Sequence, residues 1–263
     1  MTEPMAHLVD GPADAPVLLL LHGFPFAGDM WDDVRPLLGS QVRVIVPDLL
    51  AGAHRSGEPS IDRLSDGVIG ILDRLGVERA VVVGLSMGGY VALSVARDHS
   101  DRVAGLGLLN TRSAPDTEEG RAGRVALAEQ MTREESTRSL VETMPAALLG
   151  ETTRRERPDV VRRLEGLLAA PDPRDVAWGS LAMAARPDTT PVLAKVDVPT
   201  LVLTADEDTL IPPSFSEAMA AALKNGSAPT TYVVVPGAGH MSAMERPEPV
   251  AAALRDLVSA SEK

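Results

Sequence analysis

The chain has 263 residues, of which 44% are apolar and 24% charged, as in an ordinary soluble globular protein. A formal net charge of −12 argues against nucleic acid as a partner, because binding it requires clustered cations. The absence of cysteine excludes disulfides, thiol nucleophiles and thiolate metal sites.

The stretch 1–10 has neither the basic nor the apolar region of a secretory signal. No run of about 18 apolar residues occurs, so we expect no membrane span and a cytoplasmic protein. The five histidines are scattered, without the spacing of a zinc site, and we expect no metal.

Short aliphatic runs alternate with segments of helical spacing through the first part of the chain. The predicted helices cover 29–39, 60–75 and 86–98. The predicted strands cover 16–23, 42–48, 79–85 and 103–110, and the same texture returns at 199–206 and 230–237. This alternation predicts right-handed βαβ units and an open parallel sheet.

Residues 112–190 are rich in Arg, Glu, Ala and Pro, and they predict several helices without a strand. We therefore expect a core formed by 1–111 and 191–263, with 112–190 inserted as a helical cap. The arginine-rich run at 154–163 is interpreted as a solvated helix face. The alternative is that one of its arginines binds a substrate carboxylate.

Ser86 lies in Gly-Leu-Ser-Met-Gly, after a predicted strand and before a predicted helix. A sharp strand-to-helix turn there would project the hydroxyl above the carboxyl edge of the sheet. The residues two before and two after the serine would then press together, and Gly84 and Gly88 satisfy that need. The alternative is that Ser86 only caps the helix.

A serine hydroxyl needs a base, and His240 is the best candidate. It follows a predicted strand through a glycine-rich turn, so it should lie at the same sheet edge. The other histidines are weaker candidates for the base: His7 near the N-terminus, His22 shaping a loop, His54 in a loop and His99 at a helix end.

The acid that orients this base should come between Ser86 and His240 in the chain. Asp208 is our choice, because it lies beyond the end of the strand, and Asp206 is the alternative, a turn-forming carboxylate. An oxyanion hole needs two backbone N–H groups. We assign them to Met87 and to Phe24, since Pro25 has none.

Four motifs in this order, "LLLLHGFP", "GLSMGG", "ADEDTLIPP" and "PGAGHMSAMERPE", resemble the α/β-hydrolase fold superfamily over nearly the whole chain. The chain is most similar to small carboxylesterases, 3-oxoadipate enol-lactonases and cofactor-free haloperoxidases. The resemblance implies a mostly parallel eight-stranded sheet flanked by helices, a helical cap and no cofactor. It also implies a Ser86, Asp208 and His240 triad with the Phe24 and Met87 amides as the oxyanion hole.

Two features depart from the family pattern. The stretch 49–57, "LLAGAHRSG", is longer by one residue than the usual loop and lacks its glycine pattern, which makes substrate access harder to predict. Ala205 replaces a frequent glycine before the acid, which is a minor change.

The leading hypothesis is a serine hydrolase that cleaves a small carboxylic ester or lactone through an acyl-enzyme. Its apolar pocket could include Phe26, Trp31, Trp178, Met183 and Met241. The alternative for Trp178, Met183 and Met241 is that they fill the core, and for Phe26 and Trp31 that they anchor the loop after the first predicted strand. The same fold also serves lyases, cyclising enzymes and acyltransferases, and less often ligand-binding receptors. The natural substrate and the oligomeric state do not follow from the sequence.

Overall fold

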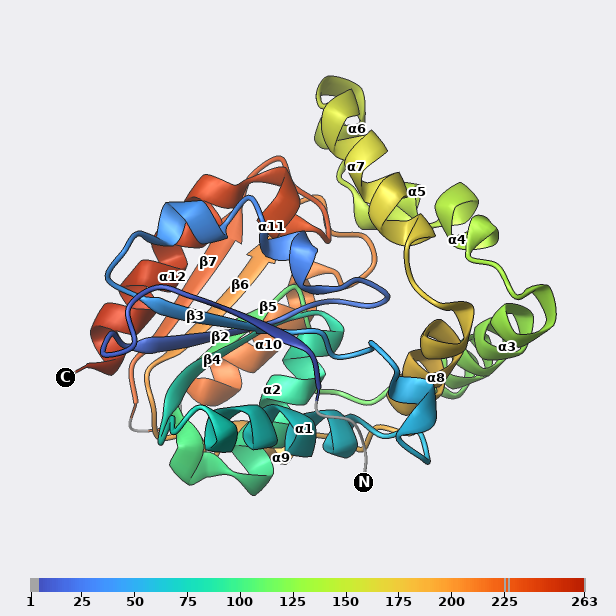
Figure 1. Ribbon diagram of the computed structural model, residues 1–263. Coiled ribbons are helices and arrows are strands. Elements are labelled where there is room, and N and C mark those ends of the chain that lie inside the picture. Colours follow the sequence, from blue (N-terminus) through green and yellow to red (C-terminus); the bar gives the residue numbers. More distant parts are fainter. Residues whose placement is uncertain (1–4, 225, 227, 263) are drawn as a thin grey trace.

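One mixed sheet organises the molecule (Figure 1). A computed structural model describes residues 5–224, 226 and 228–262. Within these residues the sheet has seven strands, in the order β1-β3-β2-β4-β5-β6-β7. Their bounds are β1 His7–Asp10, β2 Val17–Leu21, β3 Arg43–Pro47, β4 Ala80–Leu85, β5 Val103–Leu109, β6 Thr200–Ala205 and β7 Thr230–Val235. Neighbouring strands are parallel except β1, which pairs antiparallel with β3.

The six predicted strands are confirmed as β2 to β7. The implied count of eight strands is wrong for the described residues, which form seven. The sequence prediction also missed β1, whose four side chains are all exposed and therefore leave no apolar pattern.

Helices cover both faces of the sheet, as its continuous apolar strands require. One face packs against α1 (Ile61–Arg74), α2 (Met87–Asp98) and α10 (Pro213–Leu223). The other packs against α12 (Pro247–Ser261) and the 3₁₀ helices η1 (Gly28–Trp31) and η2 (Arg35–Leu38). The predicted continuous helix at 29–39 is thus wrong, because Pro36 lacks the N–H that an uninterrupted α-helix would use.

The stretch 112–190 contains helices and no strand, as predicted. These are α3 Glu118–Glu134, α4 Arg138–Thr143, α5 Pro145–Leu148, α6 Glu151–Glu156, α7 Pro158–Ala169 and α8 Pro173–Ala184, followed by α9 Thr190–Leu193. In Figure 1, α3 to α8 stand to one side of the sheet, whereas α9 packs against α2 and α10. In the described part of the chain, no helix combines the length and the apolar character that crossing a membrane requires.

The strand order contains a point at which successive connections run in opposite directions. From β2 the chain passes to β3 on one side, and then returns to β4 on the other side of β2. Such a switch point lies between β2 and β4, and open α/β sheets bind ligands at the carboxyl ends of strands there. The loops after β2 and β4, which carry Phe24 and Ser86, therefore meet at this position.

Candidate active site

Ser86 occupies a strained turn between β4 and α2. Its backbone has φ 55° and ψ −113°, a conformation that residues other than glycine rarely adopt. A Cβ on Gly84 would lie 2.0 Å from the carbonyl oxygen of Gly88, so the predicted contact between these two residues is confirmed. A Cβ on Gly88 would in turn lie 2.2 Å from the carbonyl oxygen of Leu21, because α2 begins directly against the end of β2. The glycines thus allow the turn that exposes Ser86.

The loop after β2 lies against this turn. A Cβ built on Gly23 would be 3.6 Å from the Cβ of Ser86. Phe24 follows in this loop, and Met87 is the first residue of α2. Among the described residues, neither the Phe24 nor the Met87 amide donates to a backbone acceptor. As the first residue of α2, Met87 has no acceptor for its N–H within the helix, and N–H groups of this kind are what an oxyanion hole uses.

Asp208 and His240 form a buried pair beyond the ends of β6 and β7. Nδ1 of His240 lies 2.9 Å from Oδ2 of Asp208, and the two residues are 1% and 3% exposed. Oδ1 of Asp208 accepts from the amides of Leu210 at 3.0 Å and Ile211 at 2.9 Å. Because Nδ1 of His240 donates to the carboxylate, its Nε2 is left to accept a proton.

The carboxyl of Asp208 is held in its charged form. Burial acts to raise the pKa of Asp208, but the charge of His240 and hydrogen bonds from His240, Ile211 and Asn110 outweigh burial. The pKa of Asp208 therefore lies below its ordinary value. An ionised carboxylate at this position can stabilise an imidazolium.

Residues 109–111 connect the serine to this pair, a role that the sequence prediction missed. The Ser86 amide donates to the Leu109 carbonyl at 2.9 Å, and the Thr111 hydroxyl donates to the Ser86 carbonyl at 2.8 Å. Between them, Nδ2 of Asn110 donates to Oδ2 of Asp208 at 2.9 Å, and its Oδ1 accepts from Ser242 at 2.6 Å. The signal in the sequence was a polar residue closing an apolar strand, and its φ of 43° suits asparagine.

Comparison with known proteins identifies the family of this chain. Residues 16–247 match the family described as the alpha/beta hydrolase fold. The chain belongs to this family. The resemblance inferred from the four motifs is therefore confirmed.

Three relatives illustrate the range of this family. A thermophilic esterase from Thermogutta terrifontis, solved with malate bound, is 36% identical, with a TM-score of 0.90, over 98% of this chain and 94% of its own. A protein of Caulobacter sp. strain K31 named for carbamate hydrolysis, RutD, is 29% identical over 95% of this chain and 93% of its own. The enol-lactonase from Burkholderia xenovorans LB400 is 23% identical, with a TM-score of 0.84, over 97% of this chain and 96% of its own, and shares the fold.

The remaining acidic and histidine candidates of this α/β-hydrolase have structural partners. Asp206 accepts from the Gly237 amide at 2.7 Å, the turn-forming role that was its alternative. His22 is fully buried and joins the Gly23 carbonyl to the Leu49 amide, so it does shape a loop. His7, His54 and His99 lie beside Met5, Asp175 and Asp66.

The five candidate pocket residues lie mostly in the core. Trp31 is 0% exposed and belongs to the apolar core, which favours anchoring the loop after β2 over lining a pocket. Trp178 is nearly buried, and its indole N–H donates to the Gly57 carbonyl at 2.8 Å. Met183 and Met241 are buried as well. Phe26 lines a cavity of about 290 Å³ between the 25–27 loop and residues 167–175, and the residue is 2% exposed.

The unusual stretch 49–57 is fastened to α8. The carboxylate of Asp175 accepts from the Gly52 and His54 amides, both at 3.0 Å, and from Nδ1 of His54 at 2.6 Å. His54, Asp172 and Asp175 are close enough together to hold a metal ion. Asp172 is paired with Arg174, however, so each member of this cluster already has a protein partner. We therefore assign the cluster to attaching the loop.

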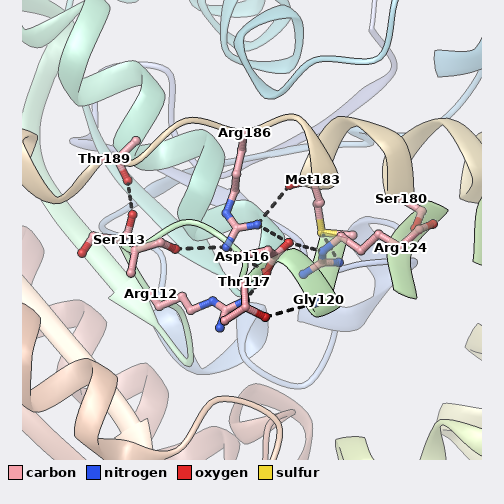
Figure 2. A network of polar contacts seen from close by, with 11 residues as sticks. Arg112, Ser113, Asp116, Thr117, Gly120, Arg124, Ser180, Met183, Arg186 and Thr189 are labelled. Carbon is pink, nitrogen blue, oxygen red and sulfur yellow. Dashed lines mark hydrogen bonds and ion pairs between the residues drawn. The ribbon is translucent and has the colours of Figure 1, made fainter. Parts of the chain in front are cut away.

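A second polar network attaches α3 and α8 to the core (Figure 2). Asp116 is buried and paired with Arg112, Arg124 and Arg186, and Nη1 of Arg186 lies 2.6 Å from Oδ2 of Asp116. The Arg186 guanidinium also stacks 4.1 Å from the centroid of the Tyr90 ring in α2. Burial acts to raise the pKa of Asp116, but hydrogen bonds and charges of Arg186 and Arg124 lower it to about 2.

The arginines that were considered for a substrate carboxylate have other surroundings. In the 154–163 run, Arg154, Arg155 and Arg162 are exposed, in keeping with a solvated face. Arg155 pairs with Glu156, and Arg163 pairs with Asp33. Arg186, which lies outside this run, is paired with Asp116.

Proposed function

We propose that this protein is a serine hydrolase that cleaves a small carboxylic ester or lactone through an acyl-enzyme, with Ser86, His240 and Asp208 as its triad. The observation that carries the proposal is the buried pair of His240 and Asp208 at the sheet edge where Ser86 occupies its strained turn. Nucleophile, base and acid follow β4, β7 and β6, in the chain order Ser, Asp, His.

In the first half-reaction, Nε2 of His240 takes the proton from Ser86 Oγ as the oxygen attacks the acyl carbon. The carbonyl oxygen becomes an oxyanion and accepts from the Phe24 and Met87 amides, each worth about 3–4 kcal/mol in the transition state. His240 then gives its proton to the departing alkoxide, and the alcohol leaves. Asp208 stabilises the transient imidazolium throughout.

In the second half-reaction, His240 takes a proton from water, whose oxygen attacks the acyl-enzyme. The tetrahedral intermediate collapses, Ser86 regains its proton from His240, and the carboxylic acid is released. For a lactone the alcohol and the acid remain one molecule. No further reactant is needed.

The substrate class rests on the relatives. The esterase relative was solved with malate, a small dicarboxylate, and the relative named for carbamate hydrolysis suggests a small acyl substrate too. We propose that 112–190 acts as the cap that bounds the substrate, and that Phe26 contributes to its pocket.

The test is hydrolysis of p-nitrophenyl esters of increasing acyl length by the wild type and by Ser86→Ala, together with phenyl carbamates. We expect serine-dependent turnover that is highest for short acyl chains. Loss of about 10⁶-fold in kcat is expected for Ser86→Ala and for His240→Ala. Turnover retained in Ser86→Ala would contradict the proposal, and turnover of carbamates alone would correct the substrate class.

A further inference from the structure

Glu245 is a buried carboxylate that the proposed reaction does not use. It ends α11 (Ser242–Glu245) and is 0% exposed. Its Oε1 accepts from the Gly239 amide at 2.9 Å, and its Oε2 accepts from the Gly150 amide at 2.9 Å. Burial raises the pKa of this carboxyl. One side chain therefore connects the residue before His240 to the start of α6.

The backbones of these two segments are also in direct contact. A Cβ on Gly239 would lie 2.3 Å from the Gly150 nitrogen, and a Cβ on Gly150 would lie 2.8 Å from the Gly239 nitrogen. On the other side of His240, the Met241 amide donates to the Leu148 carbonyl at 3.1 Å. His240 is thus flanked by two residues that are both anchored to 148–150.

We propose that Glu245 is a positioning residue, which couples 148–150 to the backbone on either side of His240 and so keeps the imidazole aligned with Ser86. The proposal rests on the proposed function, since it takes His240 as the base. Displacing 148–150 would then impair the base while leaving Ser86 and the oxyanion amides in place.

The critical variant is Glu245→Gln. The Gly239 and Gly150 amides both donate to this side chain. A carboxamide has one accepting oxygen, and its NH₂ group cannot accept from the second amide. Size and burial are preserved, whereas one of the two anchoring bonds is lost. A small displacement of a catalytic group can cost about 100-fold in rate.

The matched control is Thr152→Val. The Thr152 hydroxyl donates to Glu207 and so fastens the same segment, two residues further on. Valine keeps the shape and removes that hydrogen bond without touching 239–241. A general loosening of the segment would affect both variants, but loss of His240 alignment would affect Glu245→Gln alone.

The measurements are kcat, KM, the rate of inactivation by a p-nitrophenyl phosphonate, and Tm. For Glu245→Gln we expect kcat and the inactivation rate to fall together by about 10- to 100-fold, with KM changed less than about 3-fold. Thr152→Val should stay within about 3-fold of the wild type in kcat. If both variants lost kcat equally, or if Glu245→Gln kept the wild-type kcat, the positioning role would be overturned.

A second variant covers the case in which Glu245→Gln does not fold. Gly150→Ala would place a Cβ 2.5 Å from the Glu207 carboxylate and 2.8 Å from the Gly239 nitrogen. The substitution therefore displaces 148–150 from Gly239 without changing Glu245. It should lower kcat and leave KM nearly unchanged, and a wild-type kcat would contradict the proposal. Ser86→Ala measured in parallel reports separately on the proposed function.

Discussion

At the scale of single residues, Asp206 and Asp208 share one loop but bond to different groups. Asp206 is exposed and accepts from the Gly237 amide, whereas Asp208 is buried and holds His240. We therefore predict that Asp208→Asn lowers kcat by about 10⁴-fold, because the amide cannot hold the imidazole in the required tautomer. Asp206→Asn should stay within about 10-fold of the wild type. Steady-state measurement of kcat for the two variants tests this prediction. If Asp206→Asn lost more kcat than Asp208→Asn, Asp206 would be the acid.

The triad residues could be identified from the sequence, whereas the residues that support them could not. Ser86, His240 and Asp208 could be nominated because their roles require particular residue types in a particular chain order. Asn110 and Glu245 could not, since an amide and a carboxylate acquire their roles only through long-range contacts with Asp208 and with Gly150. Likewise, whether Trp31 lined a pocket or anchored the loop after β2 depended on packing that its neighbours in the sequence do not reveal.

At the scale of elements, the elbow between β4 and α2 depends on close backbone approach. Gly84→Ala would bring a Cβ to 2.0 Å from the Gly88 carbonyl, a backbone atom that cannot swing aside. We predict loss of at least about 100-fold in kcat together with a lower Tm. The control is Gly123→Ala in α3, where a Cβ would meet nothing within 4 Å. This change should stabilise the fold by about 0.5–1 kcal/mol. Equal effects of the two changes on kcat and Tm would contradict the steric argument.

The elements that the sequence predicted well are those in which burial imposes a pattern. β2 to β7 are nearly continuous apolar runs, and α1 buries one face. Their apolar residues therefore recur with the spacing of a strand or of a helix, and both kinds of element can be recognised in the sequence. All four residues of the edge strand β1 are exposed, and the stretch at 28–38 is interrupted by Pro36, so the local pattern of apolar residues was misleading at both places. Exposed edges and short 3₁₀ turns are determined by neighbouring elements rather than by their own composition.

At the scale of the whole molecule, the attachment of α3 and α8 to the core should make stability depend on pH. The folded-state pKa of Asp116 is about 2, below its ordinary value of 3.8. A group whose pKa is lowered by folding stabilises the protein above its unfolded pKa. That contribution, about 2 kcal/mol for a shift of this size, is lost as the pH falls from about 4 to 2.

Asp116→Asn tests this dependence. At neutral pH the variant should melt about 4–8 °C below the wild type, because Arg186 loses its buried partner. The difference in Tm should shrink as the pH falls through 4 toward 2, where the wild-type carboxylate also becomes neutral. Thermal melts at several pH values check this, and a difference independent of pH would show that Asp116 acts through packing alone.

The central claim is that Ser86 is a nucleophile activated by His240. Its most direct test is peptide mapping by mass spectrometry after treatment with a p-nitrophenyl alkylphosphonate, which phosphonylates an activated serine as p-nitrophenolate leaves. We predict one adduct per chain on the peptide that contains Ser86, none in Ser86→Ala, and far slower labelling in His240→Ala. Labelling at another serine, or equal labelling rates in the wild type and His240→Ala, would contradict the account.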